Sequence, residues 1–230
     1  IDHVDDSKIW FGAIVDIKGG CCILYKNTNY NGLCKFNGKL YDLNSNKTII
    51  NPKYLSIIHI LKNSESIDKI FIGRGKIETN DKGLVNEKVN ENYIECFVSI
   101  KQSKNRILYI NKNLKEKEKY WKVISPTAVK GGYSGFDNDK LFILNETQIH
   151  SGSYVSFKVK NKNEAISLLS YLKTDFVNKL LSIRKISQTI SKDTLKYIPL
   201  VPLNKKWNNE NIYEYYKLTD EEIELIKNTV

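Results

Sequence analysis

The chain has 230 residues, of which 41% are hydrophobic and 11% aromatic, so it can bury a core and is not a disordered tail. No signal peptide or apolar run long enough to cross a membrane is apparent, so we expect a cytoplasmic protein without a membrane partner. The formal net charge is +10. Residues 210–230 have a net charge of −4, so residues 1–209 have a net charge of +14. So basic a body indicates a polyanionic partner such as nucleic acid, with a Lys-rich solvated surface as the alternative.

The first sixty residues predict short strands followed by a helix. Apolar runs at Phe11–Ile17 and Cys21–Tyr25 precede Asn31-Gly32, a dipeptide typical of a two-residue hairpin turn, and residues 33–36 supply the return strand. Asn51-Pro52 favours a helix start, because Asn caps helix N-termini and Pro is tolerated in the first turn. The buried face of this helix is expected to hold the apolar residues at helical spacing, which are Tyr54, Leu55, Ile58 and Leu61.

Alternating apolar and polar residues predict a further set of strands. The clearest is residues 93–100, where Ile94, Cys96, Val98 and Ile100 alternate with other positions as in a half-buried strand. Residues 78–92 are polar and predict a loop. The remaining short strands are expected at residues 69–76, 106–110, 119–124, 140–144 and 154–159.

The last seventy residues predict helices. One long amphipathic helix of about five turns begins near Asn163, because apolar residues recur at three- and four-residue steps. Ser191 is expected to cap a short helix at 192–197, and two short helices follow from Asn208, the last one opened by a capping box of Thr219 and Glu222. The core stripe of the long helix consists of Ala165, Leu168, Leu169, Leu172, Phe176, Leu180 and Ile183.

Together these elements predict an α+β fold: a mixed or antiparallel sheet of short strands, with a long packed helix and a small C-terminal helical tail. We expect the main domain to cover residues 1–203 and the tail residues 204–230. The chain opens on Ile1 and contains no methionine, so we interpret it as a piece of a longer protein.

Three loops carry side chains suited to binding nucleic acid. The stretch Thr127–Gly135 is rich in glycine, which lets the backbone approach a phosphate, and its candidate residues are Lys130, Gly131, Gly132, Tyr133 and Ser134. A second candidate loop follows the long helix, where Arg can bind guanine, Gln can bind adenine, and Lys and hydroxyl groups can bind phosphate. Its candidate residues are Arg184, Lys185, Ser187, Gln188 and Thr189. Arg74 and Lys76, in a Gly-Arg-Gly-Lys bend, form the third.

Each loop also has a structural interpretation. The glycine-rich stretch could be a plain connection between strands, and Arg184 and Lys185 could serve only to stabilise the end of a helix against its dipole.

The sequence contains no complete catalytic motif. Asn51-Pro52-Lys53-Tyr54 resembles the N-P-P-Y loop of amino-methyltransferases, but Lys replaces the second Pro and no glycine-rich turn for a methyl-donor cofactor precedes it. No Glu is followed two residues later by Lys, so the E-x-K pattern of metal-dependent nucleases is absent. The four cysteines form no C-x-x-C pair and the three histidines are scattered, which favours reduced thiols over a metal site. We therefore expect a non-catalytic fragment.

Both ends of the chain resemble the region downstream of the catalytic domain in Eco57I-like restriction–modification adenine methyltransferases. Near the start, Asp16-Ile17-Lys18-Gly19-Gly20 and Tyr30-Asn31-Gly32 are similar to that family. In the C-terminal third the similar phrases are Tyr171-Leu172-Lys173-Thr174-Asp175-Phe176, Ser182-Ile183-Arg184-Lys185, Gln188, Ser191-Lys192, Tyr197-Ile198-Pro199-Leu200, Trp207 and Leu218-Thr219-Asp220-Glu221-Glu222-Ile223.

The resemblance implies a target recognition domain similar to the TaqI-like specificity domain. Its expected partners are double-stranded DNA and the methyltransferase domain of the same parent chain. The resemblance predicts no cofactor in this fragment. It is compatible with S-adenosylmethionine and Mg²⁺ as cofactors of the parent enzyme. Two alternatives stay open: a protein-interaction module of a restriction complex, and a catalytic nuclease or methyltransferase fragment.

Overall fold

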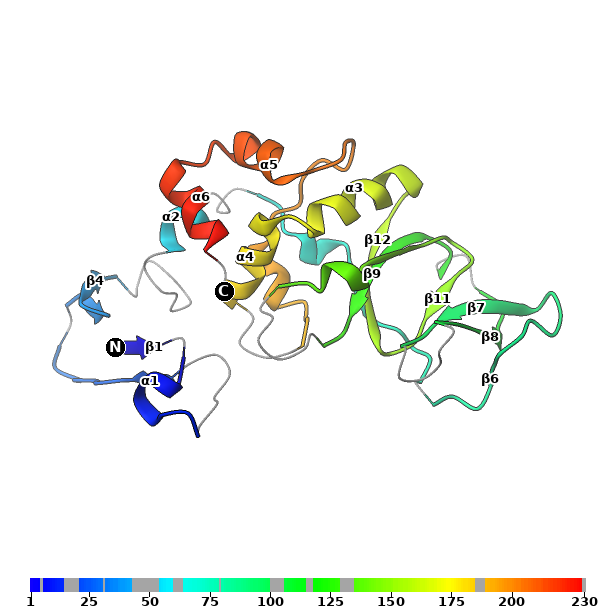
Figure 1. The fold of residues 1–230 in the computed structure, drawn as a ribbon, viewed down its shortest axis with the longest axis horizontal. Helices are drawn as coiled ribbons and strands as arrows, with labels where there is room; N and C mark the ends of the chain where they lie inside the picture. The colour runs from blue at the N-terminus through cyan, green and yellow to red at the C-terminus, as the bar shows by residue number, and fades with distance from the viewer. Residues whose placement is uncertain are drawn as a thin grey trace.

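A computed structural model describes residues 1–4, 6–14, 21–30, 32–42, 54–59, 64–78, 80–99, 106–114, 118–128, 135–184 and 189–228. These residues form several small, mainly antiparallel sheets and six α-helices, so the α+β prediction is confirmed (Figure 1). Within the described ranges, no helix is long and apolar enough to cross a membrane.

The main sheet lies at the centre of the molecule and has the strand order β10-β9-β12-β5, with every pair antiparallel. The central pair runs in unbroken register from Tyr154 opposite Pro126 to Val159 opposite Trp121. Val155 and Phe157 are fully buried in the main core, which also contains the helices. The strands are β5 (Phe71–Arg74), β9 (Trp121–Pro126), β10 (Phe142–Leu144) and β12 (Tyr154–Val159).

The prediction of one long helix was wrong, because the segment forms two helices, α3 (Lys162–Leu172) and α4 (Asp175–Arg184). Thr174 interrupts the helix: its hydroxyl donates to the Tyr171 carbonyl at 2.8 Å and accepts from the Val177 amide at 3.3 Å. A threonine side chain that binds nearby backbone groups in this way replaces helical hydrogen bonds. The predicted apolar stripe nevertheless faces the core, with Leu169 and Ile183 at its edge.

The segment that follows α4 completes the main core. The predicted capping box is confirmed, with the Glu222 amide bound to Thr219 Oγ1 and the Thr219 amide bound to the Glu222 carboxylate. Trp207, Ile212 and Ile226 are buried in the same cluster as α3, α4 and the sheet. The division into a main domain of residues 1–203 and a tail of residues 204–230 stays a prediction. The elements here are the 3₁₀ helix η5 (Thr194–Tyr197), α5 (Asn209–Tyr216) and α6 (Asp220–Lys227).

Two short segments before β5 also pack on this core. These are α2 (Leu55–His59) and the 3₁₀ helix η2 (Ile67–Lys69). The predicted buried face of α2 was wrong: Ile57 is fully buried, while Tyr54, Leu55 and Ile58 are only half-buried. The Tyr54 ring lies 5.0 Å from the buried ammonium of Lys179 on α4, so this tyrosine links α2 to α4. Leu61 and the predicted cap, Asn51-Pro52, lie outside the described residues.

A second sheet, to the right in Figure 1, has the order β11-β7-β8-β6. Its small core contains Cys96, Val98, Leu108 and Ile110, with Ile94 partly buried against them. The predicted inward face of residues 93–100 is thus confirmed at Ile94, Cys96 and Val98, and Ile100 lies outside the described residues. An aromatic cluster joins it to the main sheet, with the Phe97 ring 4.8 Å from Phe142 and 5.3 Å from Tyr154. The strands are β6 (Leu84–Val85), β7 (Tyr93–Phe97), β8 (Ile107–Asn111) and β11 (Ile149–His150), and neither β6 nor β11 was predicted.

The N-terminal segment corrects two predictions. A hairpin turn lies at Asn37-Gly38, whose φ angles of 44° and 82° suit a two-residue turn. The predicted pairing of residues 21–25 with 33–36 was wrong, because these strands pair with Asp2–Val4 and Lys39–Tyr41 instead, and the predicted turn residue Asn31 lies outside the described residues. Phe11 ends a short helix and does not begin a strand. The elements are β1 (Asp2–Val4), α1 (Lys8–Phe11), β2 (Cys21–Ile23), β3 (Cys34–Phe36) and β4 (Lys39–Tyr41), with β1 paired to β2 and β3 to β4. All four cysteines of the chain are free thiols, and Cys96 is the buried one.

Candidate nucleic-acid interface

Arg74 and the start of the glycine-rich stretch meet at one backbone carbonyl. Arg74 Nε donates to the Gly152 oxygen at 2.9 Å, and Thr127 Oγ1 donates to the same oxygen at 3.1 Å. The Thr127 amide also donates to the Ser153 carbonyl at 2.8 Å. The turn between β11 and β12 therefore holds together two candidates that are far apart in the sequence.

The same stretch also contacts the second candidate loop, which follows α4. Ala128 forms an antiparallel bridge with Thr189, and the Ile190 amide donates to the Thr127 carbonyl at 2.9 Å. Thr189 is exposed, whereas Ile190 is only 2% exposed and belongs to the main core. The beginning of the glycine-rich stretch and the end of the segment after α4 are thus fixed side by side.

The other end of the glycine-rich stretch is attached to α4. The Phe136 amide donates to Asn178 Oδ1 at 2.7 Å, and Asn178 Nδ2 donates to the Thr174 carbonyl at 3.0 Å. A Cβ at Gly135 would lie 2.4 Å from Asn178 Oδ1, so any side chain here would require the Asn178 side chain to move. We call this group of residues the loop-base cluster; it consists of Arg74, Thr127, Ala128, Gly135, Gly152, Asn178, Thr189 and Ile190.

Gly73 and Gly75 determine the position of the Arg74 side chain. Gly73 has φ of 97°, beside a register shift between β5 and β12 that is typical of a β-bulge. Gly75 packs so closely on the next strand that a Cβ would lie 2.1 Å from the His150 carbonyl oxygen. The bulge and this close approach place the exposed Arg74 side chain beside Gly152.

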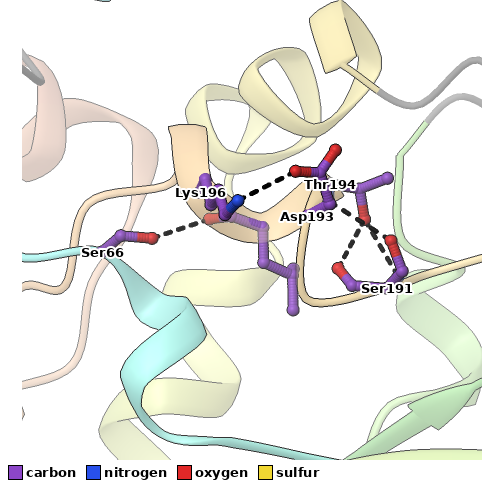
Figure 2. A network of polar contacts seen from close by, with 6 residues as sticks. Ser66, Ser191, Asp193, Thr194 and Lys196 are labelled. Carbon is purple, nitrogen blue, oxygen red and sulfur yellow. Dashed lines mark hydrogen bonds and ion pairs between the residues drawn. The ribbon is translucent and has the colours of Figure 1, made fainter.

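A polar network fixes the chain just after the cluster (Figure 2). The Ser191 amide donates to Thr194 Oγ1 at 3.0 Å, and Thr194 Oγ1 donates to the Ser191 carbonyl at 2.8 Å. Ser191 Oγ accepts from the Thr194 amide at 3.4 Å. The prediction that Ser191 caps a helix at 192–197 was wrong, because the element is a 3₁₀ helix that begins at Thr194 and has Asp193 at its N-cap position. From the other side, Ser66 Oγ donates to the Leu195 carbonyl at 3.0 Å. The position of Thr189 is therefore set by rigid structure on its C-terminal side.

Buried ionisable groups lie behind the cluster, between the two sheets. Burial lowers the pKa of His150 to about 4, and its ring Nδ1 lies 3.2 Å from the Ser151 carbonyl. Burial also lowers the pKa of Lys122 to about 8, and its ammonium donates to the Gln148 carbonyl at 2.5 Å. The Arg106 guanidinium packs 5.0 Å from the Phe142 ring centroid. These groups connect the sheets, and the charged side chain of the loop-base cluster itself is Arg74.

The structure describes four of the candidate residues that the sequence singled out. Arg74 and Thr189 lie in the loop-base cluster, and Lys76 is exposed two residues beyond Arg74. Arg184 is the last residue of α4. The remaining candidates, Lys130, Gly131, Gly132, Tyr133, Ser134, Lys185, Ser187 and Gln188, lie outside the described residues.

Sequence reasoning missed Gly152 and Asn178. The turn composition of Ser151-Gly152-Ser153 could have indicated a tight connection before β12. Nothing local marks Asn178, since its contact with Phe136 depends on the packing of α4. In the described part of the chain, no three His, Cys, Asp or Glu side chains gather in a way that could hold a metal ion.

No protein-family model and no curated protein matches the chain. The resemblance to restriction–modification methyltransferases therefore rests on the residues quoted for it, and the geometry of the loop-base cluster is an independent observation.

Proposed function

We propose that the chain recognises a sequence in double-stranded DNA as part of a restriction–modification enzyme, and so positions an adenine methyltransferase domain of the same parent chain. The observation that carries this proposal is the loop-base cluster. Three loops chosen from the sequence for their DNA-binding chemistry have described residues that touch one another or share one carbonyl.

Arg74 is the described side chain best suited to contact DNA. Its Nε is held by Gly152, which uses one of the five guanidinium donors and leaves four for a ligand. A guanidinium fixed in this way can bind the paired O6 and N7 acceptors of guanine or two oxygens of a phosphate. The net charge of +14 on residues 1–209 supports binding along the phosphate backbone.

The proposal is tested by binding to a randomised duplex library at several salt concentrations. We expect binding that weakens steeply with salt, together with a recoverable sequence preference. Arg74→Ala should lower affinity for the selected duplex by roughly 5- to 100-fold and relax the preference at one position. Arg74→Lys keeps the charge but not the planar fork, so it should retain affinity at low salt better than it retains preference.

The control is Lys88→Ala, which removes one positive charge from an exposed side chain paired with Glu91 in the connection between β6 and β7. It should change affinity only slightly. Among the other candidate residues, changes at Arg184 or Gln188 should alter sequence preference, and a change at Lys130 should weaken binding to all sequences alike. Affinity for DNA at low salt no greater than for a neutral polymer would contradict the proposal.

A protein-docking role is supported by a separate observation. Nine of the thirteen exposed large hydrophobic side chains in the described residues lie between Ile9 and Leu40, and Ile14 and Tyr25 are 98% and 84% exposed. Concentrated apolar surface marks protein contacts. We propose that the methyltransferase domain contacts this segment. A cleavage and methylation assay on the chain with Mg²⁺ and a methyl donor would reveal a catalytic fragment instead.

A further inference from the structure

Arg106 was not a candidate from the sequence, but it lies at the same end of the two sheets as the loop-base cluster. The Arg106 carbonyl accepts from the Val98 amide at 2.7 Å, and the neighbouring Phe97 carbonyl accepts from the Ser151 amide at 2.9 Å. Ser151 begins the turn between β11 and β12, and this turn holds Arg74. A series of backbone contacts therefore connects Arg106 in the second sheet with Arg74 in the main sheet.

The Arg106 side chain is held by two aromatic residues. Its guanidinium donates a hydrogen bond to the Tyr154 hydroxyl, and its guanidinium carbon lies 5.0 Å from the centroid of the Phe142 ring. Tyr154 is only 3% exposed, and both rings belong to the aromatic cluster around Phe97. Because these partners are packed between the two sheets, they fix the position of the guanidinium.

The held guanidinium can still bind a ligand. The Tyr154 hydroxyl takes one of its five N–H donors, so four remain. The contact with Phe142 uses the flat face of the group, whereas the donors point outward in its plane. Arg106 is half-buried, so part of the side chain is open to solvent.

Neither Arg74 nor Arg106 pairs with a carboxylate of the described residues. The positive charge of both arginines is therefore available to an external anion, and guanidinium groups bind phosphate strongly. The ion pairs in the described part of the chain use lysines instead, at Lys69, Lys88, Lys112, Lys140 and Lys196.

The two arginines are anchored close together along β12 and the turn before it. Arg74 is bound by the Gly152 carbonyl and Arg106 by the Tyr154 hydroxyl. The Cα atoms of residues two apart are separated by at most about 7 Å. Successive phosphates of one DNA strand are spaced by about 3.4 Å along the helix axis. Both arginines can therefore lie against the same short stretch of one duplex.

We propose that Arg106 is a second DNA contact that binds a backbone phosphate, while Tyr154 and Phe142 keep its guanidinium in position. This inference rests on the proposed function. Since its two partners hold the side chain against the sheets, Arg106 cannot extend into a groove as a base contact requires. A phosphate contact carries no sequence information directly, so Arg106 contributes affinity for any duplex.

The salt dependence of duplex binding tests this contact. We expect Arg106→Ala to lower affinity roughly tenfold for all sequences alike, and to reduce the slope of log affinity against log salt by about 1. Arg106→Lys keeps the charge, so it should keep the slope and lose part of the affinity. Tyr154→Phe removes only the hydroxyl, and it should lower affinity roughly two- to fivefold with an unchanged slope.

Lys158→Ala is the matched control. This exposed cation lies on the same strand as Tyr154 and also packs on a tyrosine ring, 5.1 Å from the centroid of Tyr120, but at the opposite end of the main sheet. Its loss should leave the slope unchanged. A second variant covers the case in which Arg106→Ala does not fold: Arg106→Gln keeps a donor for Tyr154 without the charge, and it should show the same reduced slope.

The outcomes separate this inference from the proposed function. A natural slope in the folded Arg106→Ala or Arg106→Gln chain would overturn the phosphate contact and leave the proposed function standing. A loss of preference at one base position, in place of a uniform loss of affinity, would overturn it as well. Failure of the natural chain to bind any duplex would contradict the proposed function, and the role of Arg106 with it.

Discussion

At the scale of single residues, the decisive positions are those where a backbone must come close to another. Gly75 passes the His150 carbonyl at a distance that excludes a Cβ, and Gly135 does the same at Asn178. Both glycines stand beside a proposed contact with DNA. The geometry around the loop-base cluster therefore depends on the absence of a side chain at Gly75 and Gly135 as much as on the Arg74 side chain.

Gly75→Ala should destabilise the fold, because the new Cβ meets backbone oxygen atoms that cannot swing aside. We expect a loss of about 3 kcal/mol in the free energy of unfolding, measured by urea denaturation. Gly83→Ala is the matched control, since its Cβ would meet a carboxylate oxygen of Asp81 at 3.1 Å in an exposed loop. A Gly75→Ala chain as stable as the Gly83→Ala chain would show that the close approach is not maintained in solution.

The sequence predicted Arg74 but not its setting. A Gly-Arg-Gly-Lys bend indicates an exposed arginine, because two glycines break a strand locally. It does not reveal that Nε is bound to Gly152, since that partner comes from a turn beyond β11. The contact of Asn178 with Phe136 could not be predicted for the same reason, because it depends on which segment packs over α4.

At the scale of elements, Thr174 shows how one side chain overrides a periodic pattern. The apolar stripe continues through the break, because α3 and α4 both pack on the main core. The Thr174 hydroxyl nevertheless caps α4 by accepting from the Val177 amide, and the Asp175 amide is bound by Asn209 Oδ1 at 2.8 Å. Periodicity reports which face is buried, and it is insensitive to a change of helix axis.

Thr174→Ala removes this cap and should lower the free energy of unfolding by about 1–2 kcal/mol, measured in urea. Thr147→Ala serves as the comparison, because its hydroxyl donates to Asn145 in an exposed turn. That change should cost less than about 0.5 kcal/mol. Equal stability of the Thr174→Ala chain and the natural one would mean that α3 and α4 can merge into the continuous helix that the periodicity predicted.

Strands were predictable where alternation ran long enough. β7, β9 and β12 have five or six residues each and were found, whereas β6 and β11 have two and were missed. The hairpin was misplaced because Asn31-Gly32 and Asn37-Gly38 offer the same turn chemistry. The turn forms at Asn37-Gly38 because the strands on either side of it pair with each other. The dipeptide alone does not predict that pairing.

At the scale of the whole molecule, the main sheet and the second sheet, which have separate cores, meet at a junction that contains ionisable groups. His150 is 7% exposed there, and burial lowers its pKa to about 4. Its backbone oxygen is the one that Gly75 approaches. The contact between the sheets therefore stands directly behind the loop-base cluster.

This burial makes stability depend on pH. The folded pKa of His150 lies below its ordinary value of 6.5, so the unfolded chain binds the proton first as pH falls. The contribution is complete above pH 6.5 and is lost between pH 6.5 and about 4, with a size on the order of 3 kcal/mol. Urea midpoints from pH 8 to pH 4 should show this slope, and His150→Gln should flatten it. An unchanged slope in His150→Gln would refute the assignment.

The strand order of the main sheet also determines when each strand can pair while the chain is being synthesised. β5 leaves the ribosome early, but its neighbour in the sheet is β12, about eighty residues later in the chain. β7 and β8 can pair as soon as both are made, because they follow one another and are antiparallel. The second sheet can thus begin to form while Phe71–Arg74 still waits for its partner, exposed to other strands and to chaperones. Mutations that delay β12 should therefore appear first as losses of yield in the cell.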